Sequence, residues 1–334
     1  MKMIKKKPSS FLFFISLYLM LCLLITLKAE GSNQFEALRI KLADWVEEIQ
    51  TDMPIKSSRY AKNWIIDQWA DQQEDNKILS VRSAKEFKKA HLPHALNVTH
   101  KEILSGRYLD DFDSMVTFLI YSDDGYEAVS TMVLMNLLDH KTYILKFGMM
   151  DWNLQHVYGE VWKNSHSYPV SHEKEVTGEV FKLPVIKQTS SSLEELIKSR
   201  YTSYILRKDN TILIKDITDI LQNWSENKSH YQIISVRRNK DYKTGHIANA
   251  INIPLFDLLS NEQLRRIDPD KTTLVYCDTG HLSELATTLL NLLGYNAQSI
   301  HYGMMGWNDK YISRQVAWDG SANYPVTIGD SVGY

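Results

Sequence analysis

Two cysteines occur in the chain, and only Cys277 lies where a thiol could act as a nucleophile. It follows a short β-branched and apolar run, residues 273–276, that is typical of a buried parallel strand. The next run, residues 282–293, has apolar residues at helical spacing and ends before Gly294, a helix-capping residue. A thiol at such a turn faces backbone N–H groups and the positive end of a helix dipole, which lower its pKa. The sequence therefore predicts a reactive thiolate at Cys277.

The residues after Cys277 are expected to form a loop that binds an anionic sulfur. They are Asp278, Thr279, Gly280, His281, Leu282 and Ser283. A protonated His281 could help to hold the anion, and a surface histidine without a role is an equal alternative. A lone cysteine is often only a small buried apolar residue. Its place at a strand-to-helix turn favours chemistry here.

The second cysteine, Cys22, lies in a hydrophobic N-terminal segment. Residues 1–31 begin with lysines and continue with a long apolar run, which is the pattern of a signal peptide or of an uncleaved N-terminal anchor. We expect an exported protein, periplasmic if the segment is cleaved and anchored to a membrane by this segment alone if it is not. Removal of the segment would leave one thiol and no internal disulfide.

The rest of the chain contains an internal repeat with an offset of 155 residues. The recurring landmarks are Arg82 and Arg237, His91 and His246, Gly148 and Gly303, and Trp152 and Trp307. Because the offset is the same at each landmark, one unit has been duplicated without a net insertion between them.

Within each unit, predicted strands alternate with predicted helices. This indicates an α/β fold of two tandem domains, each a mainly parallel sheet flanked by helices on both faces. We place the first domain at residues 35–165, a polar linker at 166–192 and the second domain at 193–324. An amphipathic segment, residues 35–49, is expected to pack as a helix on the first domain. Ligands bind such sheets beyond the carboxyl ends of their strands, which is where Cys277 falls.

The repeat separates residues that serve the fold from residues that serve function. Asp and Gly recur in the two loops, at 123 and 278 and at 125 and 280, so both loops should follow a similar path. The cysteine does not recur, because Ser122 occupies its position in the first domain. A serine without an activating neighbour predicts an inactive first domain and a catalytic second domain.

The same comparison applies to other polar residues. Arg82 and Arg237 occur in both units, which favours a structural ion pair with a nearby carboxylate, and Arg237 is also a candidate for substrate contact. His91 and His246 are expected to form hydrogen bonds in a loop or at the start of a helix. No cysteine or carboxylate cluster accompanies His91 and His94, so no metal site is predicted.

Composition and charge exclude some partners. Of the 334 residues, 44% are hydrophobic and 23% charged, as in ordinary globular proteins. The formal net charge of −2 gives no basis for a nucleic acid or an anionic membrane surface as partner.

These motifs resemble those of the rhodanese family of sulfurtransferases. The Val-Arg pair at 236–237 and the Gly-His-Ile segment that continues to Pro254 are similar to the family's first signature. Cys277 and its loop resemble the active-site loop, and residues 302–307 resemble the closing motif. The resemblance covers nearly all of residues 35–324 as a tandem pair in which the domain without the cysteine comes first.

The resemblance implies that Cys277 attacks a sulfane sulfur donor and carries the sulfur as a persulfide. The sulfur then passes to a thiophilic acceptor such as cyanide, a thiol or an acceptor protein. The resemblance implies no cofactor.

Some positions depart from the family pattern. Ser80 and Ser235 stand where an acidic residue is usual two positions before the arginine, and residues 248–249 are Ala-Asn in place of Pro-Gly. The loop carries Asp278 and no Arg or Lys. Because an acidic residue disfavours a dianion, the donor is open among thiosulfate, polysulfide, a protein persulfide and a mercapto acid.

Other functions compete with sulfur transfer. A related phosphatase would place an arginine in the loop, but the residue six positions after Cys277 is Ser283. A disulfide oxidoreductase needs a resolving cysteine, which the mature chain lacks. The remaining alternative is a non-enzymatic exported module that binds a partner or senses persulfides through Cys277.

Overall fold

The computed structural model describes residues 33–67, 75–106, 115–158, 161–175, 179–187, 190–207 and 210–330. The predicted signal peptide or anchor, residues 1–31, lies outside these ranges. Within them, no helix is both long and apolar enough to cross a membrane.

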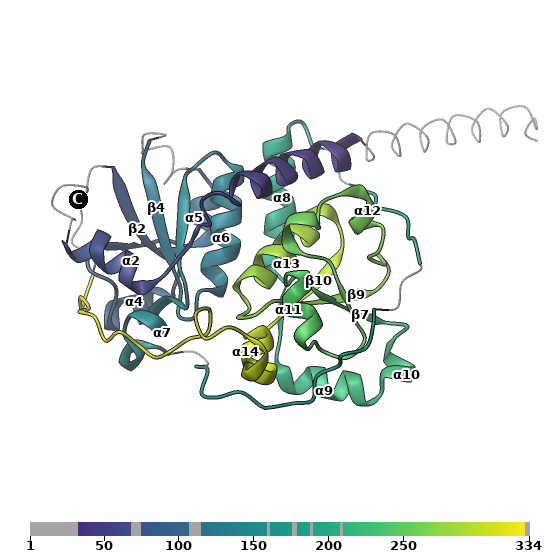
Figure 1. The fold of residues 1–334 in the computed structure, drawn as a ribbon. Coiled ribbons are helices and arrows are strands. Elements are labelled where there is room, and N and C mark those ends of the chain that lie inside the picture. Colours follow the sequence, from purple (N-terminus) through teal and green to yellow (C-terminus); the bar gives the residue numbers. More distant parts are fainter. Residues whose placement is uncertain are drawn as a thin grey trace, which may run out of the picture.

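The described chain forms two five-stranded sheets, and all neighbouring strands are parallel. The first sheet has the order β1-β5-β4-β2-β3 and the second the order β6-β10-β9-β7-β8 (Figure 1). The first comprises β1 (Ile55–Lys56), β2 (Asn76–Ser80), β3 (Ala95–Asn97), β4 (Thr117–Tyr121) and β5 (Thr142–Leu145). The second comprises β6 (Thr211–Ile212), β7 (Tyr231–Ser235), β8 (Ala250–Asn252), β9 (Thr272–Tyr276) and β10 (Asn296–Ile300). The predicted pair of α/β domains is confirmed.

Helices connect the strands in both units. A helix over residues 33–48 comes first. The first unit then contains α2 (Ser58–Lys62), α4 (Ala84–Lys89), α5 (His100–Leu104), α6 (Tyr126–Leu137) and α7 (Gly148–Trp152). After these come α8 (Leu193–Ile205), α9 (Ile214–Gln222), α10 (Trp224–Asn227), α11 (Asn239–Thr244), α12 (Asn261–Leu264), α13 (His281–Leu293) and α14 (Gly303–Asn308). Short π or 3-10 turns cover Asn63–Asp67, Leu154–His156, Leu255–Asp257 and Asp309–Tyr311.

The two elements around Cys277 form as the sequence predicts. Strand β9 lies between β7 and β10 near the centre of its sheet, and its Leu274 and Val275 are fully buried. Helix α13 begins at His281 and ends at Leu293, and its C-cap residue Gly294 adopts a positive φ of 101°. A residue with a side chain would be strained in that conformation, so glycine is favoured as the cap.

The two domains meet through α6 and α13, which lie side by side at the centre of the molecule (Figure 1). Val129 and Val133 of α6 and Leu285 and Leu289 of α13 belong to one continuous apolar cluster. The helix over residues 33–48 contributes buried side chains to the same cluster, namely Leu38, Leu42, Trp45 and Val46. The amphipathic helix expected over residues 35–49 is therefore present, and its apolar face is covered.

The segment that follows each domain in the chain packs against the other domain. The Trp307 indole donates to the Pro169 carbonyl at 2.8 Å, and the Trp152 indole donates to the Pro325 carbonyl at 2.7 Å. Figure 1 shows the yellow C-terminal segment lying along the first domain. The matching sequences are Ser-Tyr-Pro-Val at 167–170 and Asn-Tyr-Pro-Val at 323–326. The landmarks of the repeat, which share an offset of 155 residues, did not reveal this exchange of segments. One inserted residue before the second segment changes its offset to 156.

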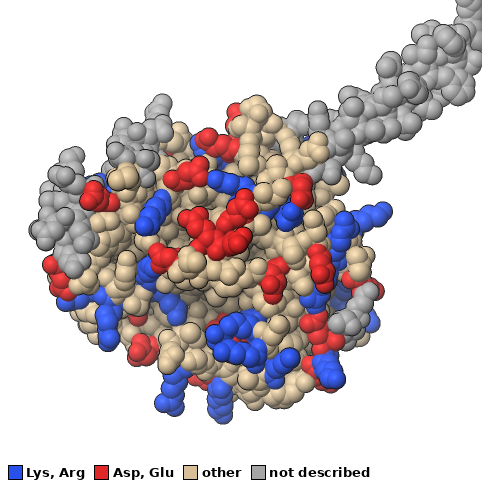
Figure 2. All heavy atoms as spheres, turned by 45° about the horizontal axis from the view of Figure 1, so that its top comes forward, with Lys and Arg blue, Asp and Glu red and all other residues tan. Residues whose placement is uncertain are grey.

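The surface carries charges of both signs. On the face shown in Figure 2, Lys and Arg side chains alternate with Asp and Glu side chains, and one group of acidic side chains lies near its centre. This mixed pattern matches the formal net charge of −2.

Candidate active site

The Cys277 sulfur lies at the turn between β9 and α13. Its Sγ accepts a hydrogen bond from the Gly280 N–H at 3.1 Å. Gly280 has a φ of 95°, a conformation that glycine adopts without strain and that directs its amide back toward the sulfur. The backbone N–H groups of Ser283 and Thr279 also act to lower the pKa of the thiol. The turn therefore presents several donors to one sulfur atom.

Burial opposes these donors. Cys277 is only 2% exposed. Burial first, and the negative charge of Asp278 second, raise the pKa of the Cys277 thiol above its ordinary value. The expectation of a lowered pKa is wrong for this closed arrangement, because the loss of hydration of a buried anion outweighs the donors around it.

Asp278 forms the ion pair that the repeat favoured for Arg237. Arg237 Nε lies 2.7 Å from Asp278 Oδ1, and Arg237 is 2% exposed. Its two other guanidinium nitrogens donate to the Gly245 and Tyr311 carbonyls at 2.8 and 2.6 Å. The arginine thus fixes the path of the loop and partly neutralises Asp278. Substrate contact by Arg237 stays a prediction.

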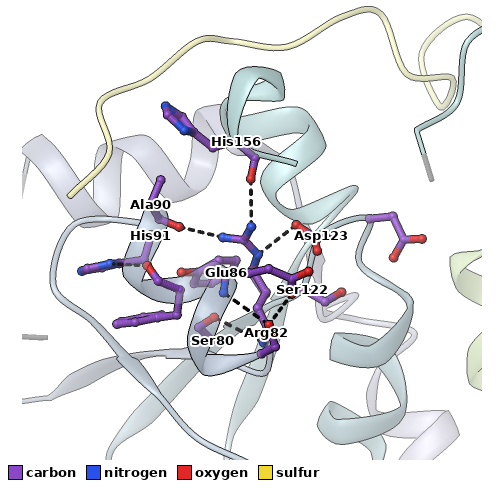
Figure 3. A network of polar contacts seen from close by, with 12 residues as sticks. Ser80, Arg82, Glu86, Ala90, His91, Ser122, Asp123 and His156 are labelled. Carbon is purple, nitrogen blue, oxygen red and sulfur yellow. Dashed lines mark hydrogen bonds and ion pairs between the residues drawn. The ribbon is translucent and has the colours of Figure 1, made fainter. Parts of the chain in front are cut away.

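The first domain repeats this network around Ser122. Arg82 Nε lies 2.8 Å from Asp123 Oδ1, and the guanidinium donates to the Ala90 and His156 carbonyls (Figure 3). Ser122 Oγ accepts a hydrogen bond from the Gly125 N–H at 3.0 Å, just as Cys277 Sγ accepts one from Gly280. The two loops therefore share one scaffold.

The loops face each other across the domain interface, and each is closed by an aromatic side chain from the other. Tyr126 is the first residue of α6, and its Oη accepts a hydrogen bond from the Tyr302 N–H at 2.5 Å. His281 is the first residue of α13, and its Nε2 accepts one from the Phe147 N–H at 3.1 Å. Since these four residues are pairs of equivalents in the repeat, the interface has local two-fold pseudosymmetry. We call this set of contacts the seam.

His281 is neither a surface residue nor a cation. It is 1% exposed. Burial, aided by the nearby Lys146 charge, lowers the pKa of its imidazole to about 3. Its Nε2 lies 3.1 Å from both the Phe147 nitrogen and the Asp124 carbonyl oxygen, and a neutral ring with an unprotonated Nε2 accepts the hydrogen bond from the Phe147 N–H. A neutral His281 therefore closes the seam and does not supply a positive charge to sulfur.

The remaining loop residues are mostly turned into the structure. Thr279 is 6% exposed, and its Oγ1 lies 3.3 Å from His281 Nδ1. The Ser283 hydroxyl donates to the Gly280 carbonyl at 2.8 Å and stabilises the turn. Leu282 is partly buried and packs against the apolar cluster between the domains.

Asp124 and His301 form a second contact across the seam. His301 Nε2 lies 2.9 Å from Asp124 Oδ2. Burial alone would raise the pKa of Asp124, but His301 and other neighbours more than compensate, so the pKa of this carboxyl is lowered. The equivalent of Asp124 in the second domain is the neutral Thr279.

Two matches to one sequence profile decide the family. The profile is described as the rhodanese-like domain, and it matches residues 65–155 and 218–310. The chain belongs to the rhodanese-like domain family. Each matched segment contains one of the two loops, with Ser122 in the first and Cys277 in the second.

Known relatives cover parts of this rhodanese-like chain. Thiosulfate sulfurtransferase PspE of Escherichia coli (strain K12) is 39% identical over 64 residues, which are 19% of this chain and 60% of the relative. A rhodanese-related protein from Thermoplasma volcanium is 26% identical, with a TM-score of 0.26, over 36% of this chain and 98% of that one. A thiosulfate sulfurtransferase from Pseudomonas aeruginosa is 12% identical, with a TM-score of 0.29, over 84% of this chain and 49% of that one.

No metal centre is found in the part of the chain that the structure describes, where no three His, Cys, Asp or Glu side chains form a group that could hold an ion. His91 and His246 instead use Nδ1 to contact the Phe87 and Tyr242 carbonyls at 3.0 and 3.2 Å. Their expected role as hydrogen-bonding residues is confirmed.

Sequence motifs did not single out three residues of this rhodanese-like site. Tyr126, Phe147 and Lys146 come from the first domain and lie at the seam beside the Cys277 loop. The only signal in the sequence was their alignment with His281, Tyr302 and His301. The alignment identifies equivalent positions but does not show that the two sets face each other.

Proposed function

We propose that the protein is a sulfurtransferase that moves a sulfane sulfur through a persulfide on Cys277. With thiosulfate as donor, the Cys277 thiolate attacks the outer sulfur, a new S–S bond forms, and sulfite leaves with the electron pair of the broken S–S bond. Cyanide or a thiolate then attacks the outer sulfur of the persulfide and regenerates the Cys277 thiolate. Neither step needs an oxidant, a reductant or a cofactor.

The position of Cys277 Sγ within the amide turn carries this proposal. The Gly280 N–H lies 3.1 Å from the sulfur, and such donors stabilise a thiolate or persulfide anion without a dedicated base. The raised pKa reflects the burial of Cys277 in the closed site. Cys277 is only 2% exposed, so the donor can reach it only if the seam opens. In the proposed cycle the seam opens to admit the donor and then closes, which excludes water from the persulfide.

The test is thiocyanate formation from cyanide with thiosulfate, polysulfide or a mercapto acid as donor. We expect Cys277→Ser to lower the rate at least about 1000-fold, because a hydroxyl cannot form a persulfide. Ser122→Ala is the matched control in the first domain and should leave the rate unchanged. Turnover that survives in Cys277→Ser would contradict the proposal.

The alternative function is a binding or persulfide-sensing module. The deep burial of Cys277 and its raised pKa favour this alternative. It predicts no turnover with any donor, together with a persulfide on Cys277 that changes the affinity for a partner. Loss of that effect in Cys277→Ser would support sensing.

We also propose that residues 1–31 direct export, either as a cleaved signal peptide or as an anchor. Fractionation of cells that produce the full chain, followed by the mass of the recovered protein, distinguishes cleaved, anchored and unexported forms.

A further inference from the structure

Lys146 of the first domain lies at the seam, next to the active loop of the second domain. It follows β5 directly, and the next residue, Phe147, donates its N–H to His281 at 3.1 Å. Lys146 Nζ donates to the Val316 carbonyl at 2.6 Å and lies 4.9 Å from the centre of the Phe147 ring. The ammonium is therefore held in place by one residue from each side of the seam.

The repeat allows Lys146 to be compared with the equivalent residue of the second domain. Lys146 is the equivalent of His301, and His301 pairs with Asp124 of the opposite loop at 2.9 Å. The equivalent of Asp124 on the side that Lys146 faces is Thr279, which has no charge. On the Ser122 side of the seam, Asp124 is therefore paired with His301. On the Cys277 side, Lys146 lies opposite the neutral Thr279.

The charges around Lys146 also connect it to the sulfur. Burial lowers the pKa of its ammonium, and the Cys277 sulfur is the largest opposing influence, followed by Asp151, Asp278 and Asp319. The same ammonium contributes to the lowered pKa of His281. Asp278 is paired with Arg237 at 2.7 Å, and among the anionic groups around Lys146 the Cys277 sulfur has the strongest influence on its ammonium.

We infer that Lys146 is the cation that holds the anionic end of the sulfur donor and then the persulfide at Cys277. This inference rests on the proposed function and deepens it in two ways. It supplies a positive charge for an anionic sulfane donor such as thiosulfate, although the loop itself carries no Arg or Lys. It also gives the first domain a part in binding, because the second domain alone would lack this charge.

The inference can be tested without turnover by comparing two alkylating reagents of similar size. Iodoacetate is an anion and iodoacetamide is neutral, and both alkylate a thiolate with release of iodide. We expect Lys146→Met to lower the ratio of the iodoacetate rate to the iodoacetamide rate about fivefold, because one attractive charge is removed. Lys146→Arg should restore the ratio. Lys141→Met, at the exposed start of the same strand segment, is the matched control and should not change it.

The two proposals fail in different ways. An unchanged ratio in folded Lys146→Met protein would overturn the role of Lys146, even if thiocyanate is formed. A lowered ratio in a protein that forms no thiocyanate with any donor would overturn sulfur transfer but keep the cation at Cys277. A raised KM for thiosulfate in Lys146→Met, with the KM for cyanide unchanged, would support both.

Discussion

The loops at Ser122 and Cys277 have the same backbone contacts and different side-chain chemistry. In each, a glycine N–H reaches the side chain at the turn, at 3.0 and 3.1 Å, and a buried arginine holds the next aspartate, at 2.8 and 2.7 Å. The two sites differ in the residue at the turn itself and in the side chains around it. The comparison shows that the scaffold alone specifies the shape of the loop but not a reactive sulfur.

The residues that differ between the two domains give Cys277 surroundings that Ser122 does not have, although the two loops share the same backbone contacts. Thr279 and Glu284 of the second domain correspond to Asp124 and Val129 of the first, and Lys146 corresponds to His301. Each loop is covered by residues of the other domain, so the first domain contributes to the environment of Cys277. A duplicated domain without a cysteine can therefore retain a function at the site of its partner.

The sharpest way to break the comparison is to exchange the two side chains. The double variant Ser122→Cys, Cys277→Ser places a thiol in the first loop and removes it from the second. We expect its sulfur transfer to be at least about 100-fold below that of the native protein, because Asp124, two residues after the new thiol, is a carboxylate where the second domain has Thr279 and disfavours an anion there. Thiocyanate formation measures this effect. Native turnover in the double variant would show that the scaffold alone is sufficient.

The two arginines provide a matched pair of variants. Arg237→Met and Arg82→Met each leave a carboxylate without its buried partner, and each should lower the free energy of unfolding by about 3–5 kcal/mol. Only Arg237→Met leaves that unpaired charge beside Cys277, so only this variant should also lose transfer activity when both are folded. Urea unfolding and thiocyanate formation, measured on the same samples, check the prediction. Equal losses of activity would show that Arg237 has no special connection to Cys277.

The seam can be disturbed at Gly280. A Cβ atom there would lie 1.5 Å from Tyr126 Oη, and the φ of 95° is itself unfavourable for a residue with a side chain. We expect Gly280→Ala to lower the free energy of unfolding by about 3 kcal/mol and to impair transfer. Gly320→Ala is the control, because its φ is also positive but no atom lies within 4 Å of the added carbon. It should cost about 1 kcal/mol, and an equal cost in both variants would argue against a tight seam.

The smallest effect concerns Glu284, which occupies the position of Val129 in the repeat. Burial raises the pKa of its carboxyl to about 8, whereas a glutamate in an unfolded chain titrates near about 4.3. Between these values the folded protein retains a proton that the unfolded chain has released, so stability falls as the pH rises. Between about pH 6 and 8, the fall in the free energy of unfolding should be about 2 kcal/mol smaller in Glu284→Gln than in the native protein. Urea unfolding at each pH measures it, with the exposed Glu262→Gln as control. An unaltered decline would show that Glu284 is already ionised.

The fold and the position of the thiol could be predicted from local patterns. The apolar run before Cys277 and the helical spacing after it are properties of neighbouring residues, and the repeat aligned Ser122 with Cys277 without a structure. The pKa of Cys277 could not be predicted in the same way, because it depends on the closure of a distant domain over the sulfur. The roles of Tyr126 and Lys146 were hidden for the same reason, since their partners are more than 130 residues away in the chain.

The most direct measurement is the mass of the Cys277 peptide before and after exposure to thiosulfate and then cyanide. We expect a gain of about 32 Da on that peptide, which disappears when cyanide is added and thiocyanate is released in equal amount. No corresponding gain should occur on the peptide that contains Ser122. An unmodified Cys277 peptide in protein that is turning over would contradict a persulfide on this sulfur.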